Sequence, residues 1–280
     1  MKTLSKYRVI SLALLAAALL AGSEPALAEN AMASHKALYD FRLVSAEAGA
    51  GINGVQGKMY FEQDATCDAW TTEHRFTTEY QYAERPSGVD ASHYVAFESM
   101  DQKTFSFSSE RQENGDTTEQ LRGSVERAED GSGKAVYSRP DDVRYDLPKG
   151  YLLPTTHTLA VISHARAGDK FFSAVLFDGT DEDGPVEVGT FIGKKVTEAE
   201  LKKIAGSNPK IDVTLLTPDA WHIRMAVFPL KDVAESMPAY EMEMIMHDNG
   251  ITSYALVDYK TFAVEQNLAA LEKIPAKKCD

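Results

Sequence analysis

The two cysteines of this 280-residue chain, Cys67 and Cys279, constrain its fold more than any other feature of the sequence. The first lies in an early strand region, and the second is the penultimate residue. If the chain is exported, a disulfide between them ties the C-terminal tail to the early strand. The chain-entropy relation for so long a loop gives roughly 5 kcal/mol of stabilisation as an upper figure. Two unpaired buried thiols are the alternative; a catalytic thiol is disfavoured because there is no Cys-x-x-Cys pair.

The N-terminal segment predicts export. Three basic residues precede an apolar run from Val9 to Leu20, and the small-x-small sequence Ala26-Leu27-Ala28 follows. This pattern is typical of a signal peptide, predicted to span residues 1–28 and to be cleaved. The apolar run is short for a membrane span, which needs about 20 residues; an uncleaved membrane anchor is the alternative. We therefore expect a soluble protein in the periplasm, where disulfides persist, with residues 29–280 forming a single domain.

The charge of the chain excludes some classes of partner. Removal of residues 1–28 leaves 26 basic and 41 acidic side chains, a net charge of −15. Nucleic acids and anionic lipid headgroups bind basic surfaces, so neither is expected as a partner. No second long apolar run follows the N-terminal one, and no membrane-spanning segment is expected.

Alternation with a period of two residues dominates the chain and predicts a mainly β fold. One face of the segment from 74 to 82 carries His74, Phe76, Thr78, Tyr80 and Tyr82. The expected strands number about a dozen, which is typical of a barrel, a sandwich or a curled sheet. They cover segments near 38–43, 55–61, 74–82, 94–97, 104–107, 171–177, 186–192, 221–228, 240–246 and 251–262. Asn53-Gly54 is a hairpin signal.

Few helices are expected. A helix of about three turns begins near Pro154 and ends at Gly168. A capping box at Thr197-Glu198-Ala199-Glu200 opens a short helix that stops at Gly206. A third short helix is expected over Asn267–Ile274, ended by Pro275.

Two strands have faces rich in methionine and aromatic residues, and these faces predict the wall of an apolar interior. Methionine is adaptable and polarizable, so such a wall can fit ligands of uneven shape. An ordinary packed core explains the same pattern. The residues expected to line an apolar cavity are Trp221, Met225, Tyr240, Met242, Met244 and Met246.

No motif in the chain predicts catalysis, a cofactor or a metal site. The letters of a dinucleotide fingerprint occur at residues 49–54, but a strand pattern follows where a helix is required. The acidic segment from Asp178 to Gly184 is expected to be a tight turn, because an EF-hand register would place glycine and threonine at ligand positions. His157 and His164 lie seven residues apart on the predicted helix. The His-x-x-x-His spacing, which binds one zinc ion from successive turns, does not occur.

Several segments together resemble the EipB family of Gram-negative periplasmic proteins, formerly a domain of unknown function. No one of them is diagnostic, but their order and the terminal cysteine are fairly specific. They are residues 35–40 (HKALYD), 57–59 (GKM), 67–68 (CD), 153–157 (LPTTH), 177–181 (FDGTD), 248–251 (DNGI), 258–262 (DYKTF) and Cys279. An alanine, Ala69, stands where the family has glycine after Cys67-Asp68.

The resemblance implies an open β-spiral, a broken barrel of about a dozen or more antiparallel strands with one packed α-helix. It also implies the bridge between Cys67 and Cys279, and a role in cell-envelope integrity and stress resistance without catalysis. Such spirals look like the half-barrels of lipoprotein carriers, which hold acyl chains.

Three functions remain open at this point. The first is a non-enzymatic envelope protein acting through protein partners, because an open spiral keeps an unpaired edge that can accept a strand or a helical-repeat partner. The second is a carrier or sensor of a lipid-like apolar ligand, and the third is a hydrolase acting on envelope polymers.

Overall fold

The structure is a computed structural model that describes residues 32–230 and 237–279. The predicted signal peptide lies outside the described residues. Two α-helices are described, α1 (Pro154–Ala167) and α2 (Glu198–Ala205). The strands are β1 (His35–Ala46), β2 (Ile52–Ala65), β3 (Ala69–Tyr82), β4 (Gly88–Ser99), β5 (Thr104–Glu113), β6 (Asp116–Arg127), β7 (Gly133–Arg139), β8 (Arg144–Leu147), β9 (Phe171–Leu176), β10 (Val186–Lys195), β11 (Ala220–Pro229), β12 (Tyr240–His247), β13 (Thr252–Asp258) and β14 (Phe262–Lys273).

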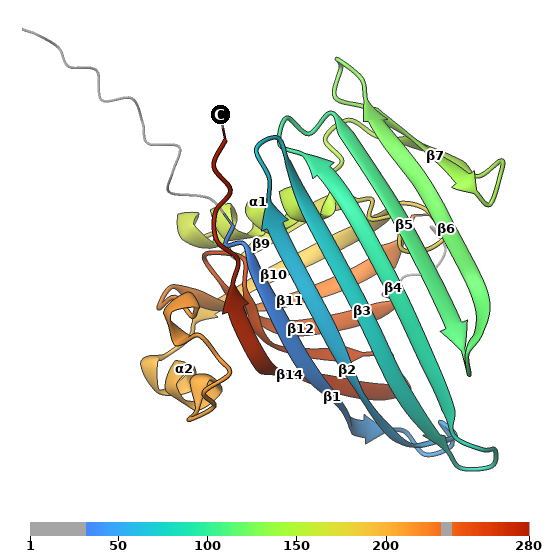
Figure 1. The fold of residues 1–280 in the computed structure, drawn as a ribbon, viewed down its shortest axis with the longest axis vertical. Helices are drawn as coiled ribbons and strands as arrows, with labels where there is room; N and C mark the ends of the chain where they lie inside the picture. The colour runs from blue at the N-terminus through green and yellow to red at the C-terminus, as the bar shows by residue number, and fades with distance from the viewer. Residues whose placement is uncertain (1–31, 231–236, 280) are drawn as a thin grey trace, which may run out of the picture. The chain divides into compact units, whose positions relative to one another are not determined.

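All fourteen strands belong to one antiparallel sheet, which confirms the prediction of a mainly β, open fold. Strands β1 to β8 pair with their neighbours in sequence to form one arm, and β9 to β14 form the other. The arms meet where β1 pairs with β14, so the first and last strands of the fold lie side by side in the middle of the sheet (Figure 1).

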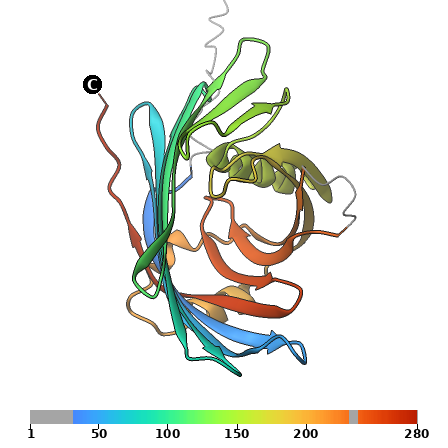
Figure 2. The ribbon, with the colours of Figure 1, turned by 90° about the vertical axis from the view of Figure 1, so that its right-hand side faces the viewer.

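The two outer strands of the sheet, β8 and β9, do not pair with each other. Instead, Leu152 bridges to β9: its N–H donates to the Val175 carbonyl at 2.8 Å, and the Phe177 N–H donates to the Leu152 carbonyl at 3.1 Å. Helix α1 follows this bridge and lies beside the space between the two arms (Figure 2). The sheet is therefore curled and braced by a helix without closing into a barrel.

Helix α1 is fixed to the sheet through its N-terminus. The residue at its N-cap, Leu153, has no side chain that can accept a hydrogen bond. The buried carboxylate of Glu98 on β4 takes that role and accepts hydrogen bonds from the backbone N–H groups of Thr155 and Thr156 at 2.8 and 2.9 Å. An acceptor at this end satisfies N–H groups that have no partner within the helix. At the other end Gly168 has a positive φ and ends the helix where predicted.

The core consists of three large clusters on the inner face of the sheet. One joins β4–β8 to Tyr151, Leu153 and Phe177. The second packs Val161, Ile162 and Ala165 of α1 against β10–β13. The third lies along the β1–β14 junction and is joined by Ile211 and Leu215 from the loop after α2.

A disulfide joins Cys67 and Cys279, as the sequence predicted. Cys67 lies in the turn between β2 and β3, and Cys279 ends a tail that runs back over this hairpin. The tail is also held by the ion pair of Lys277 with Asp64, at 2.8 Å between Nζ and the carboxylate oxygen.

The predicted helix over Asn267–Ile274 is wrong: residues 262–273 form β14. The reason is a register shift in the β1–β14 pair, where Leu38 faces Ala270 and Tyr39 faces Leu268. Ala269 is the extra residue at this shift, and it lets Leu268 and Leu271 both face the core. These two leucines are three residues apart, a spacing that is also typical of a helix.

Two further expectations need correction. The single strand expected over 251–262 is divided, with β13 ending at Asp258 and β14 beginning at Phe262. Asn53-Gly54 lies inside β2 at a register shift, and the chain turns before it, where Gly49 and Gly51 adopt positive φ. Among the described residues, no helix has the length and apolarity needed to cross a membrane.

Candidate functional site

The inner face of the sheet holds a pocket of about 430 Å³ near the β1–β14 junction. It is bounded by strands of both arms, so residues far apart in the sequence face each other across it. The lining residues are Phe41, Val55, Phe76, Thr78, Tyr80, Asp90, Ala91, Ser92, Arg111, Gln112, Glu113, Thr118, Val257, Tyr259, Phe262, Val264 and Gln266.

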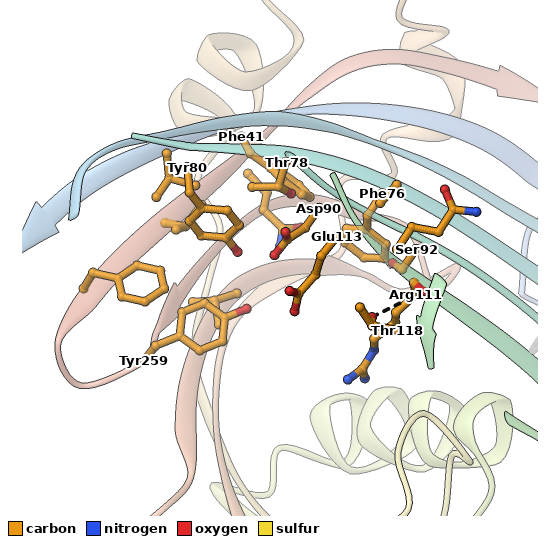
Figure 3. Close-up of a pocket in the computed structure, with 17 residues that line it drawn as sticks. Phe41, Phe76, Thr78, Tyr80, Asp90, Ser92, Arg111, Glu113, Thr118 and Tyr259 are labelled. Atoms are coloured by element: carbon orange, nitrogen blue, oxygen red, sulfur yellow. Dashed lines mark hydrogen bonds between the residues drawn. The ribbon is translucent and has the colours of Figure 1, made fainter. Parts of the chain in front are cut away.

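Aromatic rings form much of the wall. Phe41 and Phe76 are neighbours across the pocket floor, with ring centroids 5.7 Å apart. Tyr259 stacks on Phe262 at 5.0 Å, and its side chain is exposed at the mouth. Figure 3 shows the rings of Tyr80 and Tyr259 on one side of the space. The predicted face from His74 to Tyr82 thus contributes Phe76, Thr78 and Tyr80 to this wall.

Two carboxylates face the same space. Asp90 on β4 and Glu113 on β5 are direct partners in the sheet register, and Figure 3 shows both side chains on the pocket side. Burial raises the pKa of Asp90, and the negative charge of Glu113 raises it further, against the lowering effect of Arg85. Among the described residues, neither carboxylate has a hydrogen-bonded or ion-paired partner within the pocket.

Arg111 is the one cationic side chain among the residues that line the pocket, and it already has partners. The Arg111 Nε lies 3.2 Å from the Glu119 carboxylate, and its guanidinium also donates to the Thr180 carbonyl at 2.9 Å. Arg111 therefore does not neutralise the pair formed by Asp90 and Glu113. The pocket combines an apolar aromatic floor with a negatively charged side.

The phenols of the pocket remain protonated at neutral pH. Burial raises the pKa of Tyr80 to about 12, with further contributions from Tyr259 and Asp90. Tyr259 is only partly exposed, and desolvation of its buried part also raises its pKa. Both hydroxyls are therefore available as hydrogen-bond donors to a ligand.

An acidic loop, residues 177–184, packs on the inner face next to this pocket. Its backbone carbonyls accept hydrogen bonds from tyrosine hydroxyls of the sheet: Tyr94 donates to Asp178 at 2.7 Å and Tyr137 to Asp181 at 2.6 Å. Among the described residues, no group of three or more potential ligands is placed to hold a metal ion. The segment predicted as a tight acidic turn is thus a loop docked inside the spiral.

The six residues predicted to line an apolar cavity lie together beneath α1. Four of them are buried in the cluster that contains the helix residues Val161, Ile162 and Ala165, and the other two pack against that cluster. The four are Trp221, Met225, Met244 and Met246, and the two are Tyr240 and Met242. The pocket described above has a different lining, so a cavity at these six residues stays a prediction.

The two histidines of α1 both contact Phe172 on β9. His164 stacks on its ring at 4.4 Å, and its Nδ1 lies 2.7 Å from the Asp169 carboxylate. His157 is buried, and desolvation lowers its pKa to about 4. Both positions fit packing roles within the helix and its neighbour.

Ser253 and His247 form a pair that resembles part of a catalytic site. The His247 Nε2 lies 2.9 Å from the Ser253 hydroxyl, and its Nδ1 lies 2.9 Å from the Thr217 carbonyl. The two side chains are 2% and 0% exposed, respectively. A substrate does not reach a pair buried in this way, so we assign it a structural role.

The outer face carries a second feature, an aromatic groove beside strand β9. Phe171 is 67% exposed and Phe191 is 55% exposed, and they are direct partners in the β9–β10 register. Together with Phe228 and Gly189 they line a groove of about 480 Å³. Within the described chain, the free edge of β9 makes backbone hydrogen bonds only at its end, with Leu152.

A curled, unclosed sheet braced by one helix, with an amphipathic pocket on its inner face, places the chain among open barrel-like β proteins. The EipB-like family model matches residues 26–275, and the chain belongs to this family. It is 31% identical over 255 residues to the cell envelope integrity protein EipB of Brucella abortus strain 2308, covering 90% of this chain and 88% of that one. The resemblance described from the sequence is therefore confirmed.

A solved structure is also similar. It is the crystal structure of a β-barrel-like protein of a domain of unknown function from Brucella abortus, with a TM-score of 0.75 and 30% sequence identity. The match covers 88% of this chain and 99% of that one.

Sequence reasoning missed the pocket residues Phe41, Asp90, Glu113 and Tyr259. The alternation on each strand indicates which residues share a face, but only the strand register shows which strands bring these residues together. The pairing of Asp90 with Glu113 depends on the β4–β5 register.

Proposed function

We propose that this chain is a non-enzymatic periplasmic protein that maintains cell-envelope integrity by binding protein partners at the free edge of β9. Family membership supports the envelope role, because a relative in the family carries that name. The observation that carries the binding mode is the free edge of β9 beside the exposed rings of Phe171 and Phe191.

The geometry suits an extended segment of a partner. A strand added to β9 would pair with its backbone, and its alternate side chains would lie on the outer face in the aromatic groove. Gly189, which pairs with Ser173 next to the Phe171–Phe191 pair, has no side chain to fill the floor of the groove there. The partner segment would therefore be extended and apolar at every second residue. An envelope protein, including one built from helical repeats, can present such a segment.

The test is complementation in the organism that carries the gene. We expect a strain lacking the protein to be sensitive to envelope stress, and the double variant F171S/F191S to fail to restore growth although it is exported and folded. The matched control is V89S/V95S, which removes two exposed apolar side chains from the outer face of β4. Full complementation by F171S/F191S would contradict the proposed surface.

A photoreactive residue at position 173, on the same exposed face of β9, gives a second measurement. We expect one discrete protein adduct in cells, lost when Phe171 and Phe191 are replaced. A pattern of many adducts, or one that persists in the double variant, would contradict a specific strand-addition site.

A second candidate function is the binding of a small ligand by the inner pocket. The observation that favours it is the pocket of about 430 Å³ itself, because its volume and its mixed aromatic and polar lining are typical of ligand sites. Organic extracts of gently purified protein, analysed by mass spectrometry, would contain a stoichiometric ligand if this function holds.

A further inference from the structure

We propose that the inner pocket binds an organic ammonium cation carrying an apolar chain, with the ammonium group between Asp90 and Glu113 and the chain against the aromatic floor. This inference rests on the ligand-binding candidate and is independent of the partner surface at β9. It assigns a chemical class to the ligand, distinct from the acyl chains held by lipoprotein carriers.

The charge of the pocket supports a cation. Asp90 and Glu113 are direct cross-strand partners, and like charges in that arrangement destabilise a sheet. Arg111 is bound by Glu119 and by the Thr180 carbonyl. Arg85 lowers the pKa of Asp90, but its guanidinium stacks on the Tyr82 ring at 3.5 Å. A bound ammonium group would add positive charge between the two carboxylates and could donate a charge-assisted hydrogen bond to each.

The aromatic rings support an ammonium group over an inorganic cation. Tyr80 and Tyr259 lie beside the two carboxylates, with their hydroxyl ends turned towards Asp90 and Glu113 (Figure 3). Ammonium groups are attracted to the faces of such rings, and aromatic walls are the usual way in which proteins hold organic cations. Metal ions, in contrast, require several oxygen or nitrogen ligands, and no such group is placed among the described residues.

The floor supports an apolar substituent on that cation. Phe41 and Val55 are buried, and Phe76 and Val264 complete an apolar surface deeper in the pocket. A fatty acid would fit this surface equally well, but its carboxylate would lie beside Asp90 and Glu113. The pocket is therefore expected to select a cation over an anion with the same apolar chain.

The test compares three probes with the same chain length: octylammonium, octanol and octanoate. Isothermal titration calorimetry of the full-length mature protein at pH 7 is expected to give one site for octylammonium. Its affinity should exceed that of octanol by about tenfold, as expected for a charge-assisted hydrogen bond, and octanoate should bind more weakly than either.

Variants of the protein locate the site. D90N and E113Q should each weaken octylammonium binding by about tenfold and leave octanol binding unchanged. The control E126Q removes an exposed carboxylate of β6 outside the pocket and should leave both affinities unchanged. If a pocket variant does not fold, Y259A at the exposed mouth provides the replacement, with weaker octylammonium binding expected.

The outcomes test the preference for a cation separately from the ligand-binding function of the pocket. Equal binding of octylammonium and octanol, or tighter binding of octanoate, would overturn the cation preference and leave the ligand-binding function standing. Binding of none of the three probes would overturn both. Octylammonium binding that D90N and E113Q do not weaken would place the amine elsewhere on this acidic chain and overturn the assignment.

Discussion

At the scale of single residues, buried polar groups fix the geometry of this fold. Glu98 is 3% exposed, yet its carboxylate accepts two backbone hydrogen bonds and the Thr156 hydroxyl at the start of α1. The sequence offers no cap next to Pro154, so the cap comes from a strand more than fifty residues away. One side chain thus determines where the helix begins relative to the sheet.

The first prediction concerns this cap. E98Q keeps the size of the side chain but removes its charge and turns one acceptor into a donor. We expect the free energy of unfolding to fall by about 1.5–3 kcal/mol, the range for a hydrogen bond to a charged group. Urea denaturation measures the change. E126Q on the exposed face of β6 is the control, expected within about 0.5 kcal/mol of the parent; equal losses in both variants would contradict the capping role.

The second prediction concerns His74 and the pH dependence of stability. This imidazole packs between Phe61 and Tyr94, and burial lowers its pKa to about 4 from an ordinary value of 6.5. The unfolded chain therefore binds a proton at His74 in a pH range where the folded protein does not. The stability contributed by the neutral ring is present above pH 6.5 and is lost as the pH falls towards 4.

The variant H74F keeps the aromatic packing and removes the proton site. Its free energy of unfolding should decline less steeply between pH 6.5 and 4.5 than that of the parent, by up to about 1.4 kcal/mol per pH unit. Chemical denaturation at closely spaced pH values measures the slopes, and measurements above pH 7 give the constant difference due to packing. Parallel curves for the two proteins would show that His74 is not held neutral.

At the scale of elements, most strands and both helices could be predicted from the sequence, because alternation, the capping box and the terminal glycines are local signals. Strands β6, β7 and β8 were not among the expected segments, and β14 was expected to end in a helix. Leu268 and Leu271 share a side of the strand through a register shift, and their spacing imitates a helix. Residues 262–273 form a strand because they pair with the edge of β1, which lies far away in the sequence. The site was less predictable, because register alone pairs Asp90 with Glu113.

The third prediction tests the docked loop 177–184. A Cβ added to Gly179 would meet the Phe107 ring at 2.5 Å, and the residue has a positive φ. We therefore expect G179A to lower the free energy of unfolding. Backbone strain should account for about 1–2 kcal/mol and overpacking against Phe107 for about 1–3 kcal/mol more. G131A is the matched control, because Gly131 also has a positive φ but open space around its Cβ position. Equal destabilisation of the two variants in thermal melts would show that the loop does not pack on Phe107.

At the scale of the whole molecule, the disulfide holds the tail against the β2–β3 hairpin and closes a loop of 212 residues. The fourth prediction is that C67S or C279S lowers the free energy of unfolding by about 2–5 kcal/mol and the melting temperature by several degrees. The strand content should remain, because the sheet has its own core. The double variant C67S/C279S controls for effects of a single free thiol. Equal melting temperatures with and without reductant, in protein first confirmed as oxidised, would contradict the prediction.

The junction of β1 and β14 has a consequence for how the protein matures. β14, which completes the sheet, is synthesised after all the other described strands, so one side of β1 stays unpaired until residues 262–273 have been made. Neither arm can be joined to the other before that moment. The native sheet therefore becomes possible only once β14 has been synthesised. A chain truncated before residue 262 would lack β14 and would form two separate half-sheets. The unpaired edges of β1 and β13 would then be exposed to pairing with other chains.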